Sequence, residues 1–492
     1  MKWRSINYLL GSVLLYLAFA MLIPLLWAMW EKGAERLDFS MVVVLTICTA
    51  WLLLRAGEPP AELRREESFA FVTIAWLLVS LFSALPYYFA GSVPTMIDAY
   101  FEAMSGFTTT GATVIASVEQ QPQSILLWRA LTHWLGGMGI IVLFVAVFPR
   151  LGVSGALLVQ AETPGPLTQT VTPGIANSAK VLWLIYTALT AAQTIILNAV
   201  GFSFFDALTH AFATMATGGF STKNASVAGF ANPAAEWVIA FFMLLAGVNF
   251  ALYYYLLLGR VRRVFKDEEL RFYLKLVVVA TLLLVIFLLP LDYGPQAAFR
   301  HAVFQVSSVV TTTGFASTDF DRWPEFARLL LLLLMFVGGC GGSTAGGLKQ
   351  IRILVVGKYL LRELRKAVRP WEITPVRVGE QVISRQLINR IVAFVCLYLF
   401  IFICAVLYLT SLGYDLTTAC SAAASAQGNI GPGLAAVGPM HTYAPLAPGA
   451  KVCLTLLMLI GRLEIFTVFS FLLPASSRRK PVWRKGKRHN FL

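Results

Sequence analysis

The sequence predicts an all-α polytopic membrane protein with about ten transmembrane helices and four re-entrant pore helices. Three observations predict this fold. Of the 492 residues, 58% are hydrophobic and 13% are charged, and the mean hydropathy is +0.73. Apolar runs of about 20 residues, enough to span about 30 Å of hydrocarbon, recur along the chain. A short polar motif that contains glycine occurs four times, each time between a short apolar stretch and a long one.

Ten apolar runs are expected to span the membrane, and they lie near residues 5–29, 39–56, 67–90, 123–148, 180–202, 234–258, 270–290, 326–360, 386–412 and 450–474. The first run lacks the small-residue pattern of a cleavable signal peptide, so we expect it to remain as a helix. Four shorter apolar stretches precede the glycine motifs and are too short to cross. The repeated unit is therefore a span, a short re-entrant helix, a glycine loop and a second span.

The basic residues behind the formal net charge of +14 lie beside the ends of the expected spans. They cluster in residues 1–4, 260–266, 349–390 and 478–488. Because lysine and arginine are enriched on the cytoplasmic side of membrane proteins, this placement predicts that both termini are cytoplasmic. It explains the charge without binding of nucleic acid.

Aligning the four motifs on one glycine brings other positions into register. The aligned glycines and the two residues before each are Thr109, Thr110 and Gly111; Thr217, Gly218 and Gly219; Thr312, Thr313 and Gly314; and Asn429, Ile430 and Gly431. Twelve positions before each glycine lies an alanine, namely Ala99, Ala207, Ala302 and Ala419. A chance match is the alternative, but four copies about one hundred residues apart argue against it.

The glycine motifs predict a pore for a monovalent cation. A non-helical strand at membrane depth is tolerated only beside water or ions, because bare backbone groups are costly in hydrocarbon. Glycine reaches positive φ without strain, which lets successive carbonyl oxygens replace the water shell of a cation. Uncharged oxygens suit a large, weakly hydrated ion better than Ca²⁺, which usually takes several carboxylates. K⁺ is therefore the expected transported ion.

Four acidic residues near the expected outer mouth are candidates for concentrating cations, Asp98, Glu102, Asp319 and Asp321. Glu102 lies nine positions before its glycine, in register with His210 and Gln305. A hydrogen bond that braces the short helix is therefore an equal alternative for Glu102.

A glycine-rich segment interrupts the apolar run after the third motif. Its residues include Gly338, Gly339, Gly341, Gly342, Ser343, Thr344, Gly346 and Gly347. Each glycine costs up to about 1 kcal/mol against alanine in a helix, so we expect a discontinuous helix with a mobile linker that gates the pore. A phosphate-binding loop is excluded because no Gly-Lys-Ser/Thr follows at the required spacing. A close helix-packing surface is the alternative, but it would use small residues at every fourth position.

Arg462 lies in the middle of the last expected span. A central charge costs about 2.5–3.5 kcal/mol on insertion scales, so Arg462 is expected to face the pore or the glycine-rich linker. There it would repel permeating ions or hold free carbonyl groups of the linker. An ion pair with Glu464 or another acid is the alternative, although two residues apart on a helix do not face each other.

In these motifs the chain resembles the Trk/Ktr/HKT superfamily of potassium transporters, and within it the TrkH type, from about residue 67 to 474. The resemblance implies a pseudo-fourfold pore with filter glycines at Gly111, Gly219, Gly314 and Gly431, a gating loop at 338–347, and Arg462 as its partner below the filter. It also implies a homodimer in the bacterial inner membrane, docked on a cytoplasmic regulatory subunit of the TrkA type that binds nucleotides. Sodium-selective plant relatives carry serine at the first filter glycine, so Gly111 favours K⁺. The fourth loop departs from the pattern at Asn429 and Ile430, and the second at Gly218.

The expected organisation is an N-terminal transmembrane hairpin at 1–66, pore repeats at 67–150, 151–264, 265–370 and 371–474, and a basic cytoplasmic tail at 475–492. No organic cofactor is expected, whereas contact with membrane lipid is expected. An enzyme is disfavoured because the spans offer no nucleophile–base pair, paired aspartates or metal ligands. An H⁺- or Na⁺-coupled symporter working by alternating access remains the alternative, since such proteins also use repeats and broken helices.

Overall fold

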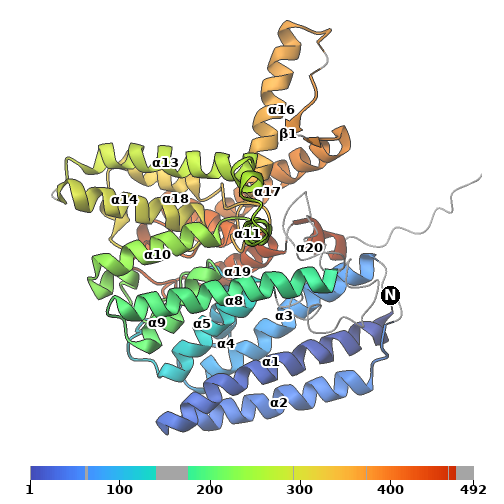
Figure 1. The fold of residues 1–492 in the computed structure, drawn as a ribbon. Helices are drawn as coiled ribbons and strands as arrows, with labels where there is room; N and C mark the ends of the chain where they lie inside the picture. Colours follow the sequence, from blue (N-terminus) through green and yellow to red (C-terminus); the bar gives the residue numbers. More distant parts are fainter. Residues whose placement is uncertain are drawn as a thin grey trace, which may run out of the picture.

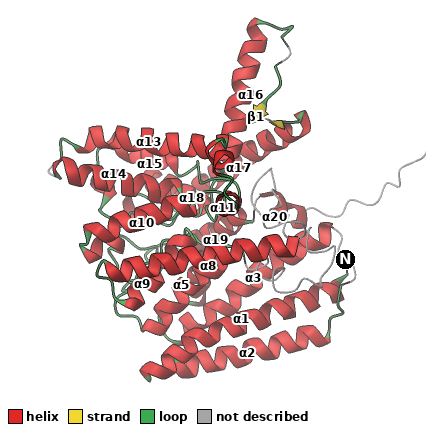
Figure 2. Ribbon diagram, viewed as in Figure 1, coloured by secondary structure: helices red, strands yellow, loops and turns green. Residues whose placement is uncertain are grey.

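The computed structural model describes residues 2–60, 65–139, 175–291, 293–372, 374–379, 381–463 and 465–472. These residues are mostly helical (Figure 2), and their only sheet pairs the antiparallel strands β1 (Arg377–Val378) and β2 (Gln381–Val382). The end of the fourth expected span, the boundary between the first two repeats and the basic tail lie outside the described residues.

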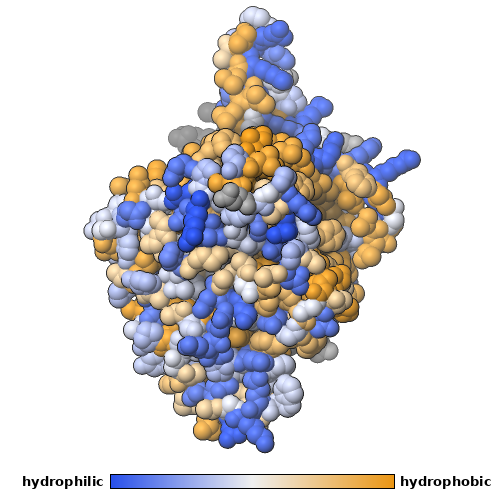
Figure 3. Space-filling model, turned by 90° about the vertical axis from the view of Figure 1, so that its left-hand side faces the viewer, coloured by the Kyte–Doolittle hydropathy of each residue, from blue (hydrophilic) through white to orange (hydrophobic). Residues whose placement is uncertain are grey.

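Six described helices are long and apolar enough to cross a membrane. They are α1 (Trp3–Glu31), α2 (Arg36–Arg55), α3 (Arg65–Phe89), α8 (Ile175–Ala199), α13 (Glu268–Leu288) and α17 (Arg385–Ser411). Each coincides with an expected span to within a few residues. Figure 1 shows the axes of α1, α2, α8 and α13 lying roughly parallel to one another. Large apolar side chains such as Trp30, Leu184 and Leu257 are exposed, as expected where lipid is the solvent. Figure 3, which looks onto the ends of the helices that run across Figure 1, shows hydrophilic and hydrophobic residues mixed on that face.

The four segments that follow the glycine motifs are interrupted or run out of the described residues. These are α5 (Gln123–Gly137); α10 (Pro233–Ala246) with α11 (Phe250–Leu257); α15 (Glu325–Leu334) with α16 (Gln350–Val368); and α19 (Pro448–Arg462) with α20 (Ile465–Leu472). The break between α15 and α16 was expected from its glycines. A continuous helix at 234–258 was wrong, because α10 and α11 meet at 93°. Asn249 caps α11 by accepting from the Ala251 amide at 2.9 Å, which starts a new helix.

The four short helices before the glycine motifs are α4 (Met96–Phe107), α9 (Phe204–Met215), α14 (Gly294–Val310) and α18 (Leu416–Gly428). Three of them begin with a polar cap, in which Thr95, Ser203 or Asp415 accepts from a backbone amide of the first turn. The four aligned alanines are fully buried, so this small residue lets each short helix pack closely. All four helices end just before their glycine motif, which confirms the expected order of short helix and glycine loop.

The remaining described elements are small or peripheral. They are α12 (Val261–Phe265), η2 (Ser226–Phe230), η3 (Phe320–Arg322) and η4 (Ala435–Val437). The far end of α16 projects from the helical body at the top of Figure 1, and β1 lies beside the lower part of this helix.

Candidate functional site

The four glycine loops, residues 109–111, 217–219, 312–314 and 429–431, meet around one centre. A Cβ atom built on each glycine would collide with a carbonyl oxygen of the next loop. The four approaches are 2.0 Å from Gly111 to Gly218, 2.0 Å from Gly219 to Thr313, 1.7 Å from Gly314 to Ile430 and 2.7 Å from Gly431 to Thr110. Each carbonyl belongs to the residue before a loop glycine, and the fourth approach returns to the first loop. The loops therefore form a closed ring in chain order.

The loops also share one backbone conformation. The residue two positions before each glycine has φ of 55° at Thr109, 54° at Thr217, 56° at Thr312 and 55° at Asn429. Such values are uncommon outside glycine, and threonine adopts them under constraint, whereas asparagine tolerates them. The four glycines have φ between 79° and 107°. Asn429 thus departs from the threonine pattern in side chain but not in conformation, and its Nδ2 donates to Thr110 Oγ1 of the first loop at 3.0 Å.

Each short helix braces the strand that follows its glycine loop. The braces are Glu102 with Thr113 Oγ1 at 3.0 Å, His210 Nε2 with Ser221 Oγ at 2.9 Å, Gln305 Nε2 with Ser317 Oγ at 3.5 Å, and Ser421 Oγ with the Leu434 amide at 2.9 Å. The first three use the aligned position nine residues before the glycine. For Glu102, therefore, the geometry shows the helix-bracing bond that the alignment offered as an alternative.

The four loop glycines line one partly open cavity, with about 570 Å³ of free space when open solvent is included, together with Thr113, Arg129, Lys223 and His441. The acidic residues expected to concentrate cations here do not line it. Each is paired with a cation: Asp98 with Lys451 at 2.5 Å, Glu102 with Arg129 at 2.8 Å, Asp319 with Arg322 at 3.0 Å and Asp321 with Arg328 at 3.0 Å. Their expected role as a free anionic mouth is therefore corrected to that of paired structural charges.

The glycine-rich linker, residues 338–347, lies directly against the glycine loops. The Gly346 amide donates to Thr312 Oγ1 at 2.6 Å, and a Cβ atom on Gly346 would lie 2.2 Å from the Gly428 carbonyl oxygen. Thr344 Oγ1 donates to the Met215 carbonyl at 3.0 Å, at the end of α9. The linker thus touches the inner ends of three of the four repeated units.

The linker contacts the bend between α10 and α11. Neither this bend nor the contact was predicted from the sequence. The Cys340 amide donates to the Gly247 carbonyl at 2.9 Å, and the Phe250 amide donates to the Gly342 carbonyl at 3.1 Å. Both partners in the bend are backbone groups freed by the break in the helix. The signal in the sequence was Gly247-Val248-Asn249, a glycine followed by a helix-capping asparagine inside an apolar run.

Arg462 faces the linker, as expected from the cost of a central charge. Its Nη1 donates to the Thr344 carbonyl at 2.8 Å, and its Nη2 donates to the carbonyls of Gly136 and Gly137 at 2.5 and 2.6 Å. It therefore joins the linker to the end of α5. Together with Lys349 and Arg352 it lines a small cavity. The alternative partner Glu464 lies outside the described residues.

Glu269, at the start of α13, is a second buried contact of the linker that the sequence did not reveal. Its Oε1 accepts from the Gly341 amide at 2.6 Å and from the Ile351 amide at 3.0 Å. One carboxylate therefore holds the linker and the first turn of α16 together.

The chain resembles known proteins over nearly its whole length. The family model TrkH, described as cation transport protein, matches residues 37–477. The chain is 38% identical over 482 residues to the Trk system potassium uptake protein TrkH of Escherichia coli (strain K12), covering 96% of this chain and 99% of that protein. The TrkH protein of Halomonas elongata is 37% identical over 494 residues, covering 99% and 100%. The crystal structure of the potassium transporter TrkH from Vibrio parahaemolyticus matches with a TM-score of 0.87 and 34% identity, over 97% of this chain and 100% of that chain.

Proposed function

This chain belongs to the TrkH family of cation transport proteins, and from that premise we propose that it takes up potassium through a selectivity filter built by the four glycine loops. Potassium uptake is the function named for its relatives over nearly the full chain. The observation that carries the filter is the closed ring of glycines and neighbouring carbonyls. Carbonyl oxygens converging from four loops are the ligands that replace the water shell of K⁺.

The filter residues in this proposal are the twelve members of the glycine loops. Peptide dipoles support it, because α4, α9, α14 and α18 all end at these loops and the carboxyl end of a helix favours a cation. The side chains of Thr110, Thr313 and Asn429 carry no charge, and in this proposal their hydrogen bonds hold the ring in shape. K⁺ is the cargo in this scheme, and the chain itself needs no organic cofactor.

The linker and Arg462 are the proposed gate. The linker residues are Gly338, Gly339, Gly341, Gly342, Ser343, Thr344, Gly346 and Gly347. The support is positional: the linker bonds to Thr312 of the third glycine loop, and Arg462 bonds to Thr344 within the linker. A segment held by a few hydrogen bonds beneath a filter is suited to open and close. In this proposal the structure has the linker in its closed position.

We place the chain in the bacterial inner membrane with both termini in the cytoplasm, on the charge pattern and the family. The relatives are named as parts of a Trk system, which supports further Trk components as partners. The proposed assembly is a homodimer docked on a TrkA-type regulatory subunit, with four pore repeats at 67–150, 151–264, 265–370 and 371–474 in each chain. The broken helices also suit an H⁺- or Na⁺-coupled symporter, which is the second candidate.

The direct test is potassium uptake by a potassium-auxotrophic bacterium that expresses this chain. We expect growth on low potassium and uptake of K⁺ in preference to Na⁺. In a bilayer, the current through a channel-like pore reverses near the potassium equilibrium potential, whatever the proton or sodium gradient. A reversal potential that follows either gradient would favour the symporter instead.

Replacing Glu269 with alanine is expected to raise basal potassium flux by about tenfold, because it removes two backbone hydrogen bonds to a buried carboxylate that hold the linker closed. The measurement is uptake without activating partner, at equal amounts of protein in the membrane. Glu325→Ala is the matched control, since this carboxylate at the start of α15 pairs with Arg328 and is not among the described residues that bond to the linker. Equal basal flux in wild type and the Glu269 variant would count against a role of Glu269 in holding the linker closed.

A further inference from the structure

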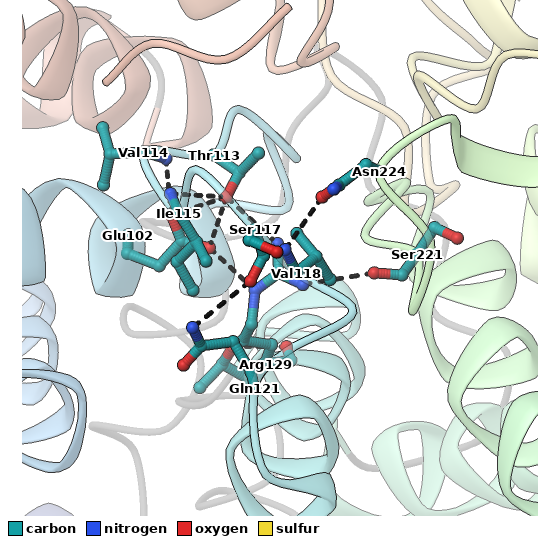
Figure 4. Close-up of polar contacts among 11 residues, drawn as sticks. Glu102, Thr113, Val114, Ile115, Ser117, Val118, Gln121, Arg129, Ser221 and Asn224 are labelled. Atoms are coloured by element: carbon teal, nitrogen blue, oxygen red, sulfur yellow. Dashed lines mark hydrogen bonds and ion pairs between the residues drawn. The ribbon is translucent and has the colours of Figure 1, made fainter. Parts of the chain in front are cut away.

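A buried arginine connects the first two glycine loops. Arg129, on α5, donates from Nε to Glu102 at 2.8 Å, from Nη2 to Thr113 Oγ1 at 3.2 Å and from Nη1 to the Ser221 carbonyl at 3.2 Å (Figure 4). Thr113 lies two positions after Gly111, and Ser221 lies two positions after Gly219. The guanidinium group therefore bridges equivalent points of two neighbouring loops.

Glu102 completes this bridge from the side of the short helix α4. Its carboxylate is fully buried and accepts from the Val114 amide at 2.9 Å as well as from Thr113 and Arg129. Arg129 is 2% exposed. The carboxylate thus holds both the strand after the first loop and the guanidinium group in place. A change in the charge of Glu102 or of Arg129 therefore affects the position of both loops.

The second loop is held by an aromatic contact on the same face of α5. The Arg129 guanidinium carbon lies 4.1 Å from the centre of the Phe220 ring, directly after Gly219. The ring of His133, one helical turn after Arg129, stacks on Phe220 at 4.0 Å. A Cβ atom on Gly218 would lie 2.3 Å from His133 Nδ1. One face of α5 therefore sets the position of the second loop.

The charged brace is peculiar to the first of the four repeated units. The other three described braces pair groups that carry no fixed opposite charges, with His210 and Gln305 in the place of Glu102 and Ser421 one position earlier. A neutral brace therefore suffices to hold a strand, and the ion pair needs another reason. Arg129 lines the cavity above the glycines together with Lys223, so without Glu102 its charge would repel an approaching cation.

We propose that Arg129 and Glu102 are positioning residues that set the separation of the first two glycine loops, and with it the preference for K⁺ over Na⁺. In this role the negative charge of Glu102 also keeps the guanidinium group from opposing cation entry. The inference rests on the proposed function of the glycine loops as a filter. It assigns a task to two side chains that need not touch the ion.

The test separates charge from bridging with three variants, measured as rates of K⁺ and Na⁺ uptake in the auxotrophic bacterium at matched amounts of protein in the membrane. Glu102→Gln keeps a hydrogen-bonding side chain but leaves Arg129 unbalanced, so K⁺ uptake should fall by about tenfold. Arg129→Lys keeps the charge but cannot bridge both loops, so the ratio of K⁺ to Na⁺ uptake should fall by about tenfold. The double variant Glu102→Gln with Arg129→Gln should recover the rate of uptake without recovering the ratio.

Asp98→Asn is the matched control. It breaks another buried pair between a short helix and an inner helix, with Lys451, and should leave the ratio of K⁺ to Na⁺ uptake unchanged. If the charge variants do not accumulate in the membrane, Thr113→Val decides, because it removes the shared hydroxyl without altering charge or size and should lower the same ratio. An unchanged ratio in Arg129→Lys, or in Thr113→Val where that variant decides, overturns the inference. The filter proposal itself is tested separately at Gly314, so the two failures are distinguishable.

Discussion

Replacing Gly314 with serine is expected to lower potassium uptake at least about a hundredfold, equivalent to about 2.8 kcal/mol. A Cβ atom at this position would lie 1.7 Å from the Ile430 carbonyl oxygen, so the backbone of one loop must move. The φ of 83° adds strain of about 1–3 kcal/mol for a residue with a side chain. Both effects displace a carbonyl of the ring. Growth on low potassium and initial uptake rates measure the loss.

The matched control for this experiment is Gly91→Ser. Gly91 has φ of 68° and no atom within 4 Å of its Cβ position, so serine there carries the strain without the collision. Uptake by this variant should stay near the wild-type rate. The parallel change Gly111→Ser, with a carbonyl at 2.0 Å, should give lost or sodium-permissive uptake. Wild-type ion preference in both loop variants would contradict the assignment of the filter.

Replacing Arg462 with alanine is expected to give fast potassium flux that no longer depends on an activating partner. Arg462 donates to one carbonyl of the linker and to two at the end of α5. A hydrogen bond to a charged group contributes about 1.5–3 kcal/mol, so loss of the linker bond alone should shift the closed state by about 10- to 150-fold. The measurement is basal flux into vesicles that contain the full chain alone.

Arg462→Lys separates two ways in which the arginine acts. Lysine keeps the positive charge on the proposed permeation path but cannot bond to three carbonyls in two directions. Flux as high as in the alanine variant indicates that the bonds to the linker are what closes the pore. Flux near the wild-type rate indicates an electrostatic barrier. Basal flux at the wild-type rate in the alanine variant would remove Arg462 from the gate.

The sequence predicted the elements of the site that depend on local chemistry. Glycine at a fixed place in a fourfold repeat, a run of glycines in a span and an arginine at the centre of an apolar run each conflict with an ordinary membrane helix. Such conflicts are visible in a single chain. The six uninterrupted spans were also predicted, because the length of an apolar run is enough to identify a membrane span.

The contacts that were missed join residues far apart in the chain. Glu269 meets the linker 72 positions later, and Arg129 meets the Ser221 carbonyl 92 positions later. No periodicity in the sequence records such a meeting. The role of the acidic residues near the expected mouth was predicted wrongly for the same reason. Asp98, for example, pairs with Lys451, which lies 353 positions away in the sequence. The bend at Gly247 lay within an apolar run, where composition favours a continuous helix.

The ring of glycines closes within one polypeptide, and this has a genetic consequence. A channel assembled from four identical subunits changes every quadrant when one codon changes. Here one codon alters one quadrant and leaves the other three intact, as the asparagine and isoleucine of the last quadrant already illustrate. Natural variation can therefore change one quarter of such a ring at a time.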